Sequence, residues 1–230
     1  MENDMSNFTY RFNFGTKIQL PIYCWYIEGA DQHILIDTGA DADMASRFRG
    51  FPAKDIASFE NALASVGLTP NDIDMVIHTH LQWDHCGNTS KCKNAKLIAT
   101  EDELLFALCP HPILAPTYRK ELLKDLDFVL VKGQYEVAPG IELIPASGHT
   151  PGTQAVSINT EQGRAIITGF CCLRENFEPP DEVRDVMPVV APGIHLNAVE
   201  AFESALRIKG LADLLIPIHD LALLRVNSIP

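Results

Sequence analysis

The chain has 230 residues and a formal net charge of −12, with 47% hydrophobic and 21% charged residues. This mixture is ordinary for a globular protein, and the length suits one large domain or two small ones. The negative charge argues against nucleic acid and anionic membrane surfaces as partners, because both attract basic patches.

We expect neither a membrane span nor a signal peptide. No apolar run reaches the length of a membrane span, and residues 1–4 lack the charged and apolar regions of a signal peptide. We therefore expect a cytoplasmic protein, in which cysteines stay reduced and pack as small hydrophobic residues. The cysteines are irregularly spaced and form no C-x-x-C pair, at Cys24, Cys86, Cys92, Cys109, Cys171 and Cys172.

The first part of the chain predicts strands and one helix ahead of a buried strand. Alternation over residues 10–14 predicts an entry strand, and residues 22–27 and 33–37 predict the two arms of a hairpin. A helical stripe over residues 55–66 precedes the short apolar run 74–78. This run is bounded by turn residues and predicts a buried strand.

The middle of the chain predicts a capped helix followed by an irregular segment. A strand over residues 95–100 ends at Thr100, which caps a helix with Glu103 completing a capping box. Prolines break this helix, and residues 109–123 carry Tyr118 in an irregular stretch. We interpret that stretch as a surface connection, with a lid over a pocket as the alternative.

The rest of the chain repeats the order of strands followed by a helix. The sequence contains no internal repeat, low-complexity tract or linker, so residues 1–230 are expected to form a single domain. The expected elements are strands at 128–131, 141–144, 154–158 and 164–168, a helix at 197–208 and a last strand at 214–218.

One loop concentrates residues that bind metal ions. Residues 79–87, which we call the ligand loop, follow the buried strand and hold His80, Asp84 and His85 within six positions. Two imidazoles and a carboxylate at this spacing are typical metal ligands. A loop that leaves a rigid strand can fold all three inward around one ion.

The ligand loop resembles the H-x-H-x-D-H motif of the metallo-β-lactamase superfamily. His80, Asp84 and His85 match the motif, and Gln82 stands where the family has its second histidine. An alternative register uses His78 and His80 as the H-x-H pair, but it leaves two extra residues before Asp84. In the preferred register His78 is a strand residue that is packed or hydrogen-bonded within the fold.

Other loops extend the resemblance over residues 22–220. Asp37 begins an Asp-Thr-Gly turn that in this family supports the metal loop, His149 lies in a G-H-T-P-G loop, and His219 matches the final ligand. The resemblance implies an α/β (α+β) four-layer αββα sandwich with its ligand loops at one edge. The loop order and residues 192–195 resemble, more narrowly, the N-acyl-homoserine-lactone lactonase-like branch.

The resemblance also implies two metal positions, with zinc as the expected ion and iron or manganese as alternatives. The ligand sets would be His80, Gln82 and His149 for the first position, and Asp84, His85 and His219 for the second. The family's bridging aspartate is replaced, because Phe170, Cys171 and Cys172 follow Thr168-Gly169. The tyrosine that lactonases carry just beyond it is also missing.

The missing bridge leaves the number of ions open at one or two. The first position can be weak or empty, which leaves an open three-ligand zinc site of the usual catalytic kind. Alternatively, a thiolate from Cys171, or less readily Cys172, restores the lost negative charge. A third interpretation is that both thiols fill space in the core.

The implied function is hydrolysis of a lactone or another small ester or amide. A metal-bound hydroxide would attack the carbonyl carbon, and Asp84 would orient it and carry a proton to the leaving alkoxide. Two alternatives remain, a non-haem iron redox enzyme suggested by Gln82, and a degenerate fold that binds a small molecule without catalysis. The expected partner is a small-molecule substrate, and neither its identity nor the oligomeric state follows from the sequence.

Overall fold

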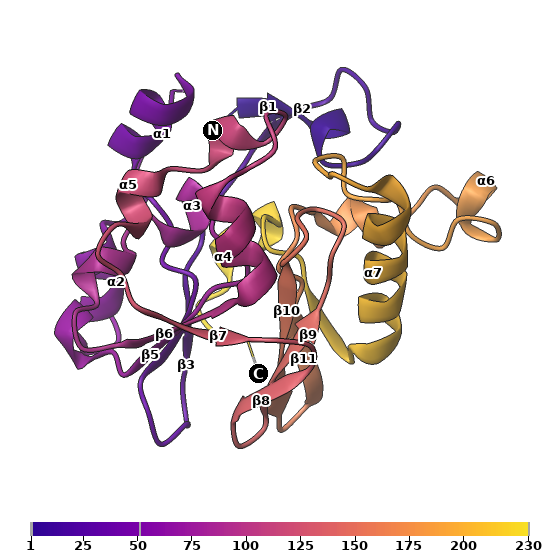
Figure 1. The fold of residues 1–230 in the computed structure, drawn as a ribbon. Helices are drawn as coiled ribbons and strands as arrows, with labels where there is room; N and C mark the ends of the chain where they lie inside the picture. The colour runs from indigo at the N-terminus through magenta and orange to yellow at the C-terminus, as the bar shows by residue number, and fades with distance from the viewer. Residues whose placement is uncertain (1, 51, 230) are drawn as a thin grey trace. The chain divides into compact units, whose positions relative to one another are not determined.

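The computed structural model describes residues 2–50 and 52–229. The chain divides into two units, which are described separately. The first unit comprises residues 22–131, and the second comprises residues 2–21 together with residues 132–229 (Figure 1). Within the described ranges, no helix is both long and apolar enough to cross a lipid bilayer.

The first unit is built on a five-stranded sheet in which four strands run in parallel. Because β4, β5 and β6 are parallel neighbours, their carboxyl ends meet at one edge of this sheet. β3 pairs with β4 in the antiparallel sense, as the predicted hairpin requires. The strands in spatial order are β3 (Trp25–Ile27), β4 (Ile34–Ile36), β5 (Met75–Ile77), β6 (Lys96–Thr100) and β7 (Phe128–Val131).

Helices of the first unit pack on its sheet through apolar side chains. Phe59 and Leu63 of α2 share a buried cluster with Leu35, Val76 and Leu97 of three neighbouring strands. Burial of such side chains contributes about 1.5–3 kcal/mol each. The helices are α1 (Ala42–Arg49), α2 (Phe59–Ala64), α3 (Trp83–Cys86), α4 (Glu101–Leu108) and α5 (Lys120–Leu123). Short 3-10 turns are η2 (Pro70–Asp72), η3 (Thr89–Lys91) and η4 (Ala115–Thr117).

The second unit has its own five-stranded sheet. β8, β9, β10 and β11 form an antiparallel run, and β12 is parallel to β11. Consequently β9, β11 and β12 share one direction and end at the same edge. The strands are β12 (Leu214–Ile216), β11 (Gly163–Ile167), β10 (Gln154–Thr160), β9 (Ile141–Pro145) and β8 (Tyr135–Ala138) in spatial order. A separate two-stranded sheet pairs β1 (Glu2–Asp4) with β2 (Lys17–Gln19).

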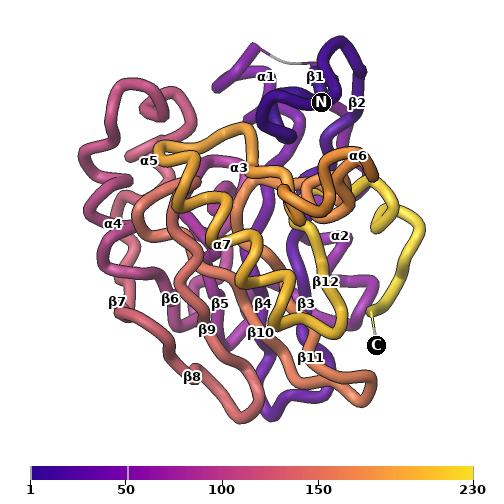
Figure 2. Tube along the Cα trace, turned by 90° about the vertical axis from the view of Figure 1, so that its right-hand side faces the viewer, coloured from indigo at the N-terminus to yellow at the C-terminus, as the bar shows by residue number. Residues whose placement is uncertain are grey.

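Helix α7 (Ala198–Leu211) covers this second sheet (Figure 2). Its residues Ala205 and Ile208 are fully buried against Ile144 and Ile166 of the strands. The Asn197 side chain caps its first turn by accepting hydrogen bonds from two backbone amides. The remaining short elements are α6 (Asp181–Arg184), η1 (Met5–Asn7), η5 (Arg174–Asn176) and η6 (Leu221–Arg225).

Most predicted elements are confirmed, with bounds that are shorter for some and longer for others, but the entry strand is wrong. Residues 10–14 form turns, because Arg11 and Asn13 have φ angles of 66° and 56°. An extended strand requires negative φ, so aromatic alternation alone misled the prediction. Thr9 makes an isolated bridge to Pro192 instead.

The close approach of the 146–153 loop to α7 generates a stability prediction. Gly148 has a φ of 120°, and a Cβ added there would overlap the backbone of Ala201. We expect Gly148→Ala to lower the free energy of unfolding by at least about 1–3 kcal/mol. Gly210 in α7 has open space within 4 Å of an added Cβ, so Gly210→Ala should instead stabilise by about 0.5–1 kcal/mol. Urea unfolding of both variants checks this, and an unchanged midpoint for Gly148→Ala would contradict it.

Candidate metal centre

The candidate site of the first unit lies where three parallel strands end. Asp37 follows β4, the ligand loop follows β5, and Glu103 lies in the first turn of α4, which follows β6. Backbone hydrogen bonds continue the pairing beyond the strands, from the Asp37 amide to Ile77 and from the His78 amide to Ile98. The sheet therefore fixes where each side chain begins.

Asp37 ties the ligand loop to the sheet. Its Oδ1 accepts a hydrogen bond of 2.8 Å from the Thr79 amide, and its Oδ2 accepts one of 2.8 Å from the Thr79 hydroxyl. The same Oδ2 lies 2.8 Å from Nδ1 of His85. Asp37 is fully buried and has a φ of 55°, a conformation that a side chain other than glycine adopts at some cost. The supporting role expected for this aspartate is confirmed.

His85 is held so that its Nε2 can act as a ligand. Because Nδ1 is bonded to Asp37, the neutral ring carries its lone pair on Nε2, as metal-binding histidines usually do. Nε2 lies 3.6 Å from Oδ2 of Asp84, and the ring centroid lies 3.9 Å from that of His80. Burial lowers the pKa of His85, but the carboxylates of Asp84 and Asp37, with Glu103, outweigh burial and raise it. Negative charge thus surrounds this imidazole, which favours a bound cation.

The side chain of Gln82 tests whether a metal ion fits the ligand loop. Its side chain is 5% exposed, and among the described residues its Nε2 has no hydrogen-bond partner. An unsatisfied buried polar group costs about 1–3 kcal/mol, and the two ends of an amide are interchangeable in such assignments. A metal ion that met the amide oxygen would remove this cost. The donors of the ligand loop therefore fit a divalent ion.

His78 has a different role from the ligands. It is 1% exposed, and its Nε2 lies 2.8 Å from the hydroxyl of Thr89. Burial is the main cause that lowers the pKa of His78 to about 4, so the ring is neutral. The packed and hydrogen-bonded position expected for His78 is confirmed, and it favours the register that begins at His80.

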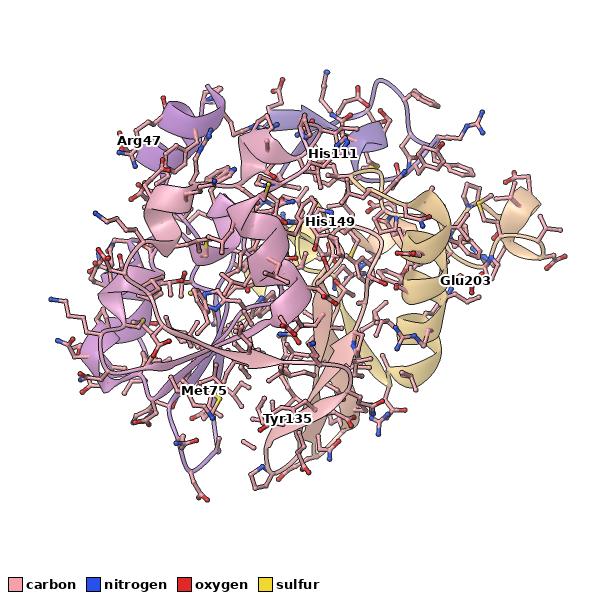
Figure 3. All side chains as sticks on the ribbon, in the orientation of Figure 1. Arg47, Met75, His111, Tyr135, His149 and Glu203 are labelled. Atoms are coloured by element: carbon pink, nitrogen blue, oxygen red, sulfur yellow. The ribbon has the colours of Figure 1, made fainter. Side chains whose placement is uncertain are left out.

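The second unit presents two histidines at the ends of parallel strands. His149 lies in the loop after β9 (Figure 3), and its Nδ1 is 2.7 Å from the carbonyl oxygen of Ile194. His219 follows β12, and its Nδ1 is 2.9 Å from the carbonyl oxygen of Pro21. Each Nδ1 therefore donates to a backbone oxygen, which selects the tautomer with its lone pair on Nε2. His195 instead bonds the Pro192 carbonyl and contacts the ring of Tyr10.

The segment after β11 carries apolar groups where the resemblance places a bridging carboxylate. Phe170 is 1% exposed and packs against Phe177, with ring centroids 6.2 Å apart. Cys172 belongs to the same core, and its Sγ lies 3.1 Å from the Thr168 hydroxyl. Burial raises the pKa of Cys172 to about 12, which favours the neutral thiol that packs in this core. Cys171 is also buried, and its role as a ligand stays a prediction.

Two residues of the first unit were not recognised from the sequence as parts of the site. Oε1 of Glu103 accepts hydrogen bonds of 2.8 Å from the Leu81 amide and from the Tyr118 hydroxyl. The predicted cap at Thr100 is confirmed by its bond from the Glu103 amide. The capping pattern already accounts for an acidic residue at position 103, so the sequence offered no further reason to connect Glu103 with the ligand loop.

The Asp37 contacts generate a prediction for metal affinity. We expect Asp37→Asn to weaken binding of a divalent ion by about 10–100-fold, because the amide cannot accept all the hydrogen bonds of the carboxylate. Competition with a chromophoric chelator, with Zn²⁺ as the probe, measures the affinity. Asp74→Asn is the matched control, because Asp74 also accepts a backbone hydrogen bond, from His33, away from the ligand loop. Equal affinities for Asp37→Asn and the parent would contradict the role of Asp37.

Comparison with known proteins places these observations in a family. Residues 18–212 match the model of the metallo-beta-lactamase superfamily. The N-acyl homoserine lactonase AiiA of Bacillus thuringiensis subsp. kurstaki is 32% identical over 183 residues, covering 74% of this chain and 70% of that protein. The N-acyl homoserine lactonase AiiB of Agrobacterium fabrum is 27% identical, covering 71% and 67% of the two chains.

A solved structure gives the same result for the fold. The structure of an N-acyl homoserine lactone hydrolase, with the product N-hexanoyl-L-homoserine bound at its catalytic metal center, aligns with a TM-score of 0.79. It is 28% identical and covers 99% of this chain and 92% of its own. The α/β fold class expected from the sequence is confirmed. The chain belongs to the metallo-beta-lactamase superfamily, in its N-acyl homoserine lactonase-like branch.

Proposed function

We propose that this protein is a metal-dependent hydrolase that opens lactones, with N-acyl homoserine lactones as its substrate class. Similarity to named N-acyl homoserine lactonases over most of the chain supports the reaction class. The geometric observation that carries the proposal is His85, held by Asp37 through Nδ1 and facing the Asp84 carboxylate through Nε2. This arrangement offers a neutral imidazole nitrogen and a negatively charged carboxylate oxygen to one cation.

The proposed ligands come from both units of the chain. Asp84 and His85, with His219, are assigned to the main position, whereas His80, Gln82 and His149 are assigned to a weaker one. The assignment is supported by the family motif and by the Nδ1 hydrogen bonds that orient His85, His149 and His219. We propose zinc as the ion, because imidazole and carboxylate donors suit it, with iron or manganese as alternatives.

Charge favours one tightly bound ion rather than two. Two divalent ions bring four positive charges, and among the proposed ligands only Asp84 carries a formal negative charge. Phe170, which is buried, provides none where the family resemblance places a carboxylate. Uncompensated charge in a buried site is costly, so the second ion is the weaker one. A thiolate at Cys171 remains the candidate group for strengthening it.

The chain's own residues would perform the remaining work of the reaction. A bound ion supplies a Lewis acid that polarises the lactone carbonyl and acidifies water. Asp84 would accept a proton from the attacking water and pass it to the leaving alkoxide, the acid–base role of a carboxylate beside the reacting groups. His85 does not rotate freely, because Asp37 holds its ring, and this fixed orientation lowers the cost of reaching the transition state.

The alternatives raised by the sequence are less favoured. A redox enzyme and a non-catalytic binding fold were suggested by the altered ligand positions, yet the relatives reported above are named lactonases. A small molecule is the expected partner, with no nucleic acid and no membrane surface. The single domain over residues 1–230 and the cytoplasmic location stay predictions from the sequence.

Turnover by an Asp84 variant tests the proposed function. We expect zinc-loaded parent protein to hydrolyse N-hexanoyl-homoserine lactone and Asp84→Asn to lose at least about 100-fold in kcat, because the amide cannot relay a proton. Acid release recorded with a pH indicator measures the rate. Asp102→Asn, on the exposed side of α4, serves as the control. Unchanged hydrolysis by Asp84→Asn, or no hydrolysis by the parent, would refute the proposal.

Restoring the missing imidazole tests the assignment of the weaker position. We expect Gln82→His to raise the affinity for a second equivalent of Zn²⁺ by at least about tenfold, because imidazole nitrogen is a better zinc ligand than an amide oxygen. Gln82→Ala should leave the first equivalent bound and weaken the second. Equilibrium dialysis followed by elemental analysis measures the affinities for the first and the second equivalent of Zn²⁺. A second affinity that is the same in Gln82→His and the parent would contradict the assignment.

A further inference from the structure

We propose that Glu103 and Tyr118 are positioning residues that hold the ligand loop in the conformation that binds the metal ion. The inference rests on the proposed function for its consequence, although the contacts themselves belong to the first unit alone. It assigns a purpose to the irregular segment 109–123, which the family motifs do not include.

Glu103 contacts the ligand loop at its backbone rather than at a ligand. Its Oε1 accepts a hydrogen bond of 2.8 Å from the amide of Leu81, which lies between His80 and Gln82. Glu103 is 1% exposed, and Leu81 is fully buried. Hydrogen bonds to a charged acceptor are about twice as strong as neutral ones, so the carboxylate fixes the peptide plane that joins two proposed ligands.

Tyr118 fixes Glu103 in turn. Its hydroxyl donates to the same Oε1 at 2.8 Å, and its ring packs edge-to-face on Phe106 of α4 with centroids 5.5 Å apart. Tyr118 is 4% exposed. Tyr118 is therefore a buried anchor within a segment that is otherwise mostly exposed or half-buried, as a surface connection would be.

The neighbouring residue Arg119 reaches the ligand loop by a second route. Its Nη2 donates to the Phe48 carbonyl at 2.7 Å, and its guanidinium lies 4.8 Å from the centroid of the Phe48 ring. Phe48 in turn packs edge-to-face on Trp83 of the ligand loop, with centroids 6.1 Å apart. Consecutive residues of one segment thus support the loop both at Leu81 and at Trp83.

The charge of Glu103 adds to this positioning. Asp37, Asp84 and Glu103 are three buried carboxylates that lie at or beside one loop. Asp37 and Glu103 act from outside the proposed ligand set, and their charge favours a cation at the ligand loop. A neutral residue at position 103 should therefore weaken ion binding even where the backbone keeps its shape.

Two variants separate the contribution of the Glu103 charge from that of the Tyr118 hydroxyl, and each has a matched control. Glu103→Gln keeps an oxygen acceptor and removes the charge, and Tyr118→Phe removes only the hydroxyl. Glu60→Gln removes a carboxylate that pairs with Lys91 at 2.8 Å on the surface. Tyr26→Phe removes a hydroxyl that lies 2.9 Å from Nδ1 of His33. Both controls belong to the same unit and lie outside the contacts described here.

The experiment measures zinc affinity by chelator competition and, in metal-free protein, hydrogen exchange of the Leu81 amide by NMR. We expect about tenfold weaker zinc binding for Glu103→Gln and roughly threefold to tenfold for Tyr118→Phe, with both controls within about twofold of the parent. Exchange at Leu81 should accelerate in both variants and stay unchanged in the controls, because the hydrogen bond that protects this amide is weakened.

Failure of this inference is distinguishable from failure of the proposed function. If the parent binds zinc and folded Tyr118→Phe binds it equally well, with Leu81 equally protected, the positioning role is wrong while the metal site stands. If the parent binds no zinc, the proposed function fails, and Leu81 exchange alone decides whether the two residues hold the loop. Should Glu103→Gln fail to fold, Tyr118→Phe decides the question.

Discussion

The site of the first unit depends on one buried carboxylate. Asp37 accepts hydrogen bonds from the amide and hydroxyl of Thr79 and holds Nδ1 of His85. It therefore fixes the first residue of the ligand loop and the ring of His85 near the end of that loop. A buried carboxylate is stable only when such donors surround it. Asp37 adopts a left-handed backbone conformation, and these contacts offset the local strain of that conformation.

Sheet topology explains why the donors gather where they do. In the first unit, parallel pairing brings the carboxyl ends of β4, β5 and β6 together, and these ends lead to Asp37, the ligand loop and Glu103. In the second unit, β9, β11 and β12 share a direction, and their ends lead to His149, to the segment beginning at Thr168, and to His219. Binding at the carboxyl ends of strands is a general property of such sheets.

Much of this arrangement could be predicted from the sequence, because short apolar runs and spaced ligands leave local signals. The ligand loop and the packed state of His78 follow from residues near one motif, and the support from Asp37 follows from the family resemblance. The entry strand at 10–14 failed because positive φ at Arg11 and Asn13 has no apolar signature. Glu103 and Tyr118 escaped notice because their contacts with Leu81 and with each other join residues 15 to 22 positions apart.

The altered ligand positions change the site without removing its basis. Phe170 is part of the core where the family resemblance places a carboxylate, and Gln82 offers an amide where the resemblance places an imidazole. In the proposed site, Asp84 and His85 are the ligands for one cation, and the buried carboxylates beside them add negative charge. A chain of this kind should retain one strong position and one weak one.

The central claim is tested most directly by elemental analysis of metal per chain, on protein purified without chelator and dialysed against metal-free buffer. The account predicts close to one divalent ion retained per chain, and its loss in Asp84→Asn. No retained ion, even after reconstitution with Zn²⁺, Fe²⁺ or Mn²⁺, would contradict the account and leave the fold as a binding protein without a metal centre.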